Sequence, residues 1–104
     1  MKPLLNTILL FLLVIGFSGG VSGQSVSHFE ETKRLAEQGN VNAQSDLGFL
    51  YSLGLGVPED DAEAVRWYRL AAEQGNASGQ FGLGFMYRNG DGVPEDDAEA
   101  VSWW

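Results

Sequence analysis

Two acidic clusters are the first residues in this sequence that could carry out chemistry. Glu59–Asp61 returns as Glu95–Asp97, and each cluster directly follows a proline. Carboxylates are ligands that calcium prefers, and Asn89–Gly92 adds a faint likeness to the start of a calcium-binding loop. Pro94 interrupts that loop, however, and no glutamate stands at its twelfth position. We therefore interpret the acids as helix caps and predict neither a metal nor a cofactor.

Nucleophilic catalysis would require a serine with a base beside it, because the sequence contains no cysteine. The only histidine is His28, which we expect to be exposed in the first turn of the first helix. Ser45, Ser52 and Ser78 have no evident base. We therefore predict that the chain is not an enzyme.

Three tryptophans could form a cage around a ligand or could pack inside a core. Trp67 and Trp103 recur at the same phase of a repeat, which favours core packing. Trp104 has no following residue to cover it. As a hypothesis, Trp103 and Trp104 form an exposed end through which the chain could associate with another copy or a partner.

The elements that must position these residues are set by an internal repeat. Gly56–Val65 returns letter for letter as Gly92–Val101, 36 residues later. When the whole chain is shifted by that offset, 22 of 33 aligned positions are identical. Self-similarity at such a period indicates a repeat architecture, in which each unit buries its apolar face against its neighbours.

Apolar residues at helical spacing, separated by cap and stop residues, predict a row of helices. Ser27 and Glu30 form a capping-box signature, so we expect a first helix from about His28 to Gln38. The expected caps of the later helices are Asn40, Asp60, Asn76 and Asp96, and the expected stops are Gly54, Gly75 and Gly90.

Gly48 and Gly84 stand at the same phase inside two of these helices. Because glycine costs about 1 kcal/mol within a helix, we interpret both positions as points where helices approach closely.

The repeated unit closely resembles the Sel1-like repeat, a branch of the tetratricopeptide-like helical repeats. The resemblance covers about Leu35 to Trp104 and depends on spaced glycines, a Gly-Val-Pro connector and an aromatic pair. In the first unit these are Gly39, Leu47-Gly48, Tyr51, Gly54, Gly56-Val57-Pro58 and Trp67-Tyr68. The resemblance implies an all-α fold in which antiparallel helix pairs stack into a short right-handed α-solenoid. It also implies the scaffolding of protein complexes rather than catalysis.

Residues 1–23 have the pattern of a secretory signal peptide. Lys2 precedes the apolar run Ile8–Phe17, and small residues lead to Gly23, after which we expect cleavage. An uncleaved membrane anchor is disfavoured, because such an anchor needs about 18–20 apolar residues. We expect an exported chain, periplasmic or secreted, of bacterial type. The expected organisation is 1–23 signal peptide, 24–39 lead and first helix, 40–75 first repeat and 76–104 second, truncated repeat.

The charge balance bears on the kind of partner. Without Lys2, five basic residues stand against 14 acidic ones, a formal net charge of −9. Such a balance repels phosphate backbones and anionic lipid, so we predict no nucleic-acid partner and favour basic protein surfaces. The alternative is that the charge only keeps a small exported domain soluble.

Comparison of the two copies locates positions that differ between them. On the first helix of each pair, Ser45 becomes Phe81 and Ser52 becomes Arg88, whereas Phe49 returns as Phe85. First helices line the concave face of tetratricopeptide-like solenoids. We therefore predict a partner-binding groove formed by Phe49, Ser52, Phe81, Phe85 and Arg88. The alternative is ordinary surface drift, with the phenylalanines packed between helices.

The sequence thus predicts a non-catalytic module that binds a peptide or protein through its concave helix face. The alternative function is an envelope enzyme or enzyme accessory acting near peptidoglycan, related to β-lactams or muropeptides. That alternative comes from cysteine-rich members of the family that the repeat resembles, and the absence of cysteine here weakens it.

Overall fold

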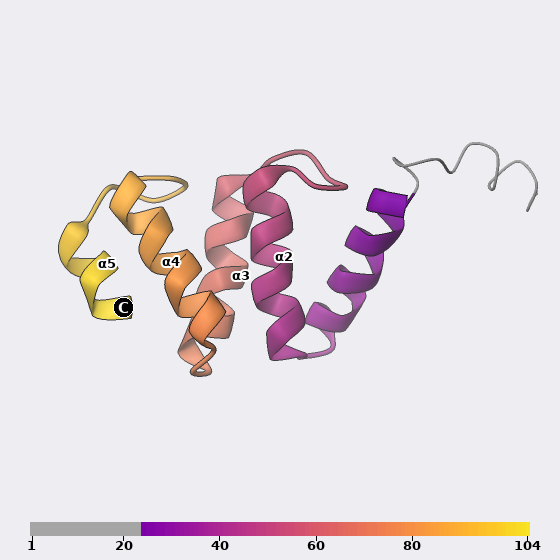
Figure 1. Cartoon of the computed structure of the whole chain (residues 1–104), viewed down its shortest axis with the longest axis horizontal. Coiled ribbons are helices and arrows are strands. Elements are labelled where there is room, and N and C mark those ends of the chain that lie inside the picture. Colours follow the sequence, from indigo (N-terminus) through magenta and orange to yellow (C-terminus); the bar gives the residue numbers. More distant parts are fainter. Residues whose placement is uncertain (1–23) are drawn as a thin grey trace, which may run out of the picture.

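The computed structural model describes residues 24–104, and every regular element in that part of the chain is a helix (Figure 1). The predicted cleavage of Met1–Gly23 lies outside the described residues. The helices are an N-terminal helix over 24–37, α2 (Val41–Leu53), α3 (Asp61–Glu73), α4 (Ala77–Asn89) and α5 (Asp97–Trp103). The predicted all-α fold class is therefore confirmed.

Polar side chains begin the four later helices, at the positions that the sequence predicts. A side-chain oxygen of each cap accepts a hydrogen bond from a backbone N–H of the first turn, which would otherwise lack a partner. The pairs are Asn40 with Ala43 at 2.9 Å, Asp60 with Glu63 at 3.1 Å, Asn76 with Gly79 at 2.7 Å and Asp96 with Glu99 at 3.0 Å.

The backbone at the aspartate caps is bonded differently from a full capping box. The backbone N–H of Asp60 donates to the carbonyl oxygen of Tyr51 at 2.9 Å, and that of Asp96 donates to Tyr87 at 3.0 Å. The Glu63 carboxylate instead forms an ion pair with Arg66 at 3.1 Å. Each connector is thus tied back to the helix that precedes it.

Glycine ends the first helix of each pair. Gly54 and Gly90 cap α2 and α4 in the left-handed region, with φ of 67° and 70°. A side chain at either position would be strained, which explains why both copies keep glycine there.

The start of the N-terminal helix differs from the prediction. Ser27 lies inside a helix that already includes Gln24, so Ser27 and Glu30 do not begin it. The additional turn, which contains Ser25, packs closely against Gly56. A Cβ added at Gly56 would collide with the carbonyl group of Ser25 and lie 3.1 Å from the Cβ of Phe29. This turn therefore rests on the connector of the first repeat.

The helices form a single row in which each helix packs against the next in antiparallel orientation (Figure 1). α2 also contacts α4, so the first helices of successive pairs lie side by side. Two buried clusters fill the row. One contains Phe29, Ala36, Ala43, Leu47, Leu50 and Trp67, and the other contains Ala64, Val65, Tyr68, Ala72, Leu83 and Met86.

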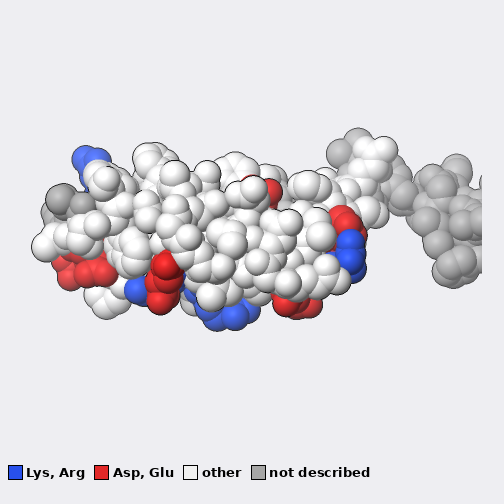
Figure 2. Space-filling model, turned by 90° about the horizontal axis from the view of Figure 1, so that it is seen from below, with Lys and Arg blue, Asp and Glu red and all other residues white. Residues whose placement is uncertain are grey.

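Amide side chains link successive units at the turns 38–40 and 74–76. The buried Gln44 donates through Nε2 to the carbonyl oxygen of Ala36 at 3.2 Å, and Gln80 donates to Ala72 at 3.4 Å. Gln74 donates in turn to Gln44 Oε1 at 2.8 Å. Seen from the end that holds these turns, most charged side chains gather toward one long edge, and most of the surface is uncharged (Figure 2).

Candidate functional site

Tyr68 of α3 fills the space between α2 and α4 and forms the floor of the candidate site. A Cβ added at Gly48 of α2 would lie 2.8 Å from the Tyr68 ring, and one added at Gly82 of α4 would lie 2.5 Å from it. The two glycines therefore let both helices approach one buried ring, as expected for Gly48. Burial raises the pKa of the Tyr68 hydroxyl, because the phenolate loses its hydration.

A groove of about 820 Å³ runs along α2 and α4 above this floor. Its lining includes Phe49, Ser52, Phe81 and Phe85, four of the five residues predicted for partner binding. The side chains come from the two first helices, which the 36-residue repeat places next to each other. The structure therefore brings these four residues together on one surface.

The three phenylalanines of the groove are exposed. The exposed fractions are 50% for Phe49, 64% for Phe81 and 48% for Phe85. Burying a phenylalanine side chain contributes about 1.5–3 kcal/mol, so three left half in water make an unusual surface. The three rings are therefore not buried between helices, and ordinary surface drift stays the alternative to a partner-binding role.

Arg88 does not line the groove. Its guanidinium lies 5.7 Å from the ring centroid of Trp104, a cation–π contact. The ring of Phe81 also stacks on Trp104, with centroids 6.3 Å apart and planes 21° apart. Arg88 and Trp104 therefore form a separate aromatic and cationic edge that begins where the groove ends, at Phe81.

The structure separates the two tryptophans that were expected to form an exposed end. Trp103 is only partly exposed, packs against the second buried cluster and donates through Nε1 to Glu99 Oε1 at 3.0 Å. Trp104 is 55% exposed. Trp67, the equivalent of Trp103 in the first unit, is buried, as the repeat phase predicts.

Four acidic residues also line the groove, and the sequence analysis did not assign them to it. They are Asp46 of α2, Glu59 and Asp91 of the two connectors, and Asp61 of α3. No lysine or arginine is among the lining residues. The sequence alone could not reveal this set, because its members come from two helices and two connectors that only the stacking of units brings together.

A second, smaller hollow of about 550 Å³ extends the groove toward the N-terminal helix. Asp46 and Phe49 line both hollows, and His28 and Leu55 are among the other lining residues of the second. The two hollows therefore adjoin at Asp46 and Phe49, and their lining residues come from α4, α2 and the N-terminal helix among other segments.

The repeat pattern, the cap geometry and this fold agree with one protein family. The family model described as Sel1 repeat matches residues 41–76 and 77–104. The chain belongs to the Sel1 repeat family. Proteins of this family are generally protein-interaction modules and are typically not enzymes.

Three solved structures are similar to this Sel1 repeat chain. The protective antigen c5321 of uropathogenic Escherichia coli, which displays an SLR fold, is 45% identical with a TM-score of 0.73 over 75% of this chain. A Sel1 repeat protein from Oxalobacter formigenes is 44% identical with a TM-score of 0.67 over 69%. Cysteine rich protein B of Helicobacter pylori is 27% identical with a TM-score of 0.67 over 72%.

This Sel1 repeat chain corresponds to only part of those proteins. It spans 17%, 21% and 56% of the three matched chains, in the same order. No curated protein matches the sequence. Among residues 24–104, no helix combines the length and the apolar character that crossing a bilayer requires.

The residues considered for catalysis have other roles in this Sel1 repeat. The hydroxyls of Ser45 and Ser52 donate to the carbonyl oxygens of Asn42 and Phe49 in their own helix, at 2.9 Å and 2.8 Å. Ser78 lines the groove. Within the described residues, His, Asp and Glu form no group of three that could hold a metal ion.

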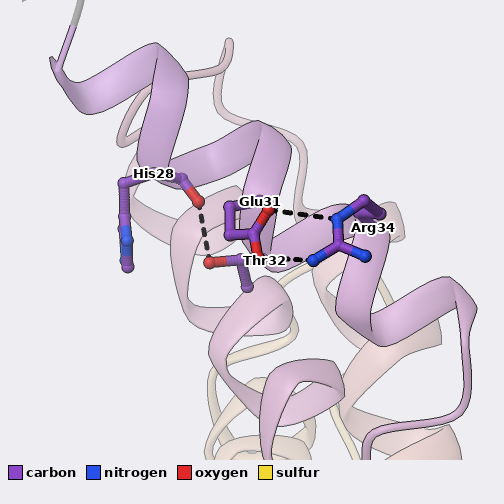
Figure 3. A network of polar contacts seen from close by, with 4 residues as sticks. All are labelled: His28, Glu31, Thr32 and Arg34. Carbon is purple, nitrogen blue, oxygen red and sulfur yellow. Dashed lines mark hydrogen bonds and ion pairs between the residues drawn. The ribbon is translucent and has the colours of Figure 1, made fainter.

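The side-chain polar contacts drawn in Figure 3 join residues of the N-terminal helix to one another. Arg34 forms an exposed ion pair with Glu31 at 2.6 Å, which lowers the pKa of that carboxyl. Thr32 donates to the carbonyl oxygen of His28 at 2.8 Å. The imidazole of His28 points away from these three side chains. The arrangement stabilises the helix surface and resembles no catalytic group.

Proposed function

We propose that this Sel1 repeat chain is an exported, non-catalytic interaction module that binds a segment of a partner protein in the groove over α2 and α4. The observation that carries the proposal is the exposure of Phe49, Phe81 and Phe85 within one groove of about 820 Å³. The signal-peptide pattern of residues 1–23 supports the exported location.

The repeat itself argues that the exposed rings are kept for contact. Phe49 and Phe85 are equivalent positions of the two units, and both are about half exposed, at 50% and 48%. A side chain that served only the core would be buried. Leu47 and Leu83, which are also equivalent positions of the two units, are buried in this way. A bound segment that covers both rings would remove their apolar surface from water and gain free energy accordingly.

Two other predicted residues have supporting roles. Ser52 is part of the groove lining, and its hydroxyl, which donates to the carbonyl oxygen of Phe49, adds a polar group to that surface. Arg88 and Trp104 extend the surface at the Phe81 end of the groove. A longer partner would contact that edge after it leaves the groove.

A peptide display selection with the purified chain tests this function. Random ten-residue peptides are selected on residues 24–104, and the enriched peptides are then measured against a Phe49→Ser/Phe85→Ser variant. We expect at least a tenfold loss of affinity, because each removed ring gives up a buried apolar contact. Leu70→Ser is the matched control, because Leu70 is an exposed apolar residue of α3 outside the groove lining.

The proposal fails if no peptide is enriched. It also fails if enriched peptides bind the double phenylalanine variant as tightly as they bind the parent chain and the Leu70→Ser control.

A further inference from the structure

We infer that the segment held in this groove is extended and cationic, with lysine or arginine side chains on either side of apolar ones. This inference rests on the proposed binding function and specifies the chemistry of the partner. Its basis is the arrangement of the acidic side chains around the exposed phenylalanines.

The acids of the groove come from two parts of its lining. Asp46 is one helical turn before Phe49 on α2. Glu59, Asp61 and Asp91 come from the connector end of the units. The second connector lies against the first turn of α3 there, since a Cβ added at Gly92 would lie 2.6 Å from the carbonyl oxygen of Asp61. The apolar rings are thus flanked by negative charge at two places.

These four carboxylates have no basic partner within residues 24–104. The ion pairs of the described chain are Glu31 with Arg34 and Glu63 with Arg66, and both lie outside the groove lining. Arg69 lies beside Tyr87 and Arg88 lies over Trp104. The charge of the groove is therefore not neutralised by the chain itself, and a cationic segment would neutralise it on binding.

Asp46 differs from the acidic residues that the fold uses at its helix ends. Asp60 and Asp96 each accept a backbone N–H, so their charge serves the helix ends. Asp46, by contrast, is exposed in the middle of α2, and its equivalent in the second unit is Gly82. An acidic residue at that position is not needed to build the unit, which is consistent with a role in contact.

The length of the surface favours an extended chain over a single side chain. The groove and the smaller hollow adjoin at Asp46 and Phe49, and their lining residues come from α4, α2 and the N-terminal helix among other segments. Neighbouring helices are about 8–10 Å apart, so three of them span roughly 20 Å, the length of about six extended residues. Side chains of such a strand alternate, which suits apolar contacts interspersed with basic ones.

Three defined octapeptides test the inference, each carrying a fluorophore for anisotropy measurements. The first alternates lysine with leucine or phenylalanine. The second replaces every lysine by glutamate, and the third keeps the lysines and replaces the apolar residues by serine. We expect binding of the first peptide, at least tenfold weaker binding of the other two, and a loss of affinity as salt screens the charges.

A charge-neutralised variant locates the effect in the groove. Asp46→Asn/Glu59→Gln/Asp91→Asn leaves Asp61 in the first turn of α3, where its charge suits the helix dipole. We expect this variant to bind the first peptide about tenfold more weakly, since exposed charge pairs contribute modestly and three are removed. The control changes the net charge equally at exposed sites outside both hollows, as Glu30→Gln/Glu37→Gln/Glu73→Gln.

The possible results separate the inference from the function on which it rests. Equal binding of the acidic and cationic peptides, or equal weakening by the control variant, would overturn the inference while leaving a binding groove. Absence of binding by all three peptides would overturn the inference, and peptide binding that Phe49→Ser/Phe85→Ser leaves unchanged would overturn both. A chain that dimerises through the groove and excludes the peptide would show that a second copy is the occupant, which also overturns the inference.

Discussion

Trp104 lies against Gly84 in the way that Tyr68 lies against Gly48 in the preceding unit. Both pairs are separated by 20 residues, and an added Cβ at either glycine would collide with the aromatic ring. Tyr68 is covered on its other side by Gly82 and is buried. Trp104 is contacted by Phe81 and Arg88 and stays 55% exposed. The same contact between a glycine and an aromatic ring thus occurs twice. It is buried at Gly48 and Tyr68, which we call the closed form, and exposed at Gly84 and Trp104, which we call the open form.

The closed form predicts an inverted effect of alanine at Gly48. In an ordinary helix, glycine to alanine stabilises by about 1 kcal/mol. Gly48→Ala should instead destabilise by about 1–3 kcal/mol, because its Cβ would lie 2.8 Å from the Tyr68 ring. Urea unfolding of residues 24–104 measures the change. Ala62→Gly, at an exposed position of α3, serves as the propensity control. A stabilised Gly48→Ala variant would refute the packing account.

The open form predicts that the chain associates through Trp104. An exposed tryptophan stacked on Phe81, which is itself 64% exposed, gives a contact surface that a second copy could bury. We expect sedimentation across a wide concentration range to show self-association that Trp104→Ser reduces. Leu70→Ser removes an exposed apolar residue from α3 and should leave the self-association unchanged. A monomer at every concentration would contradict this prediction.

Burial of Tyr68 predicts a dependence of stability on alkaline pH. Loss of hydration raises the pKa of its hydroxyl above the usual value near 10, so the folded state holds this proton to higher pH than the unfolded state does. The resulting stability is complete below about pH 10 and is lost as the pH rises through the folded pKa. Urea midpoints between pH 8 and 12 should fall more steeply for the parent than for Tyr68→Phe. Tyr51, whose pKa burial also raises, accounts for part of the remaining slope.

The first 23 residues carry a prediction about processing. In a Gram-negative host, the full chain should be cleaved after Gly23, because Lys2, the apolar run and the small residues form a signal-peptide pattern. N-terminal sequencing of the exported protein should then begin at Gln24 or within a few residues of it. Recovery of intact Met1 from the membrane fraction would show that the segment is retained.

Local features of the fold could be predicted because they depend on a few adjacent residues. A cap such as Asn40 needs only the backbone of its own first turn, and Gly54 needs only its own φ. The start of the N-terminal helix could not be predicted in this way. Ser27 offers a local cap, but the contact between Ser25 and Gly56, 31 residues away in the sequence, extends the helix beyond it.

The candidate groove was predictable only in its aromatic part. Phe49 and Phe85 recur at one phase, so comparison of the copies points to them. The acidic part required the structure, because Asp46, Glu59 and Asp91 come from a helix and two connectors that only the stacking of units brings together. The position of Arg88 depends on Trp104, which replaces the repeat's tyrosine and draws the guanidinium over its ring.

The amide contacts between units set how the molecule would respond to salt. Gln44, Gln74 and Gln80 join neighbouring units without a formal charge, whereas the carboxylates of the groove would hold a cationic segment through charge. Dissolved ions screen attraction between exposed charges. The contacts that hold the row together and the charges that would hold a cationic segment are therefore physically independent. A rise in salt would empty the groove without dismantling the solenoid, so capture and release would alternate on one intact scaffold.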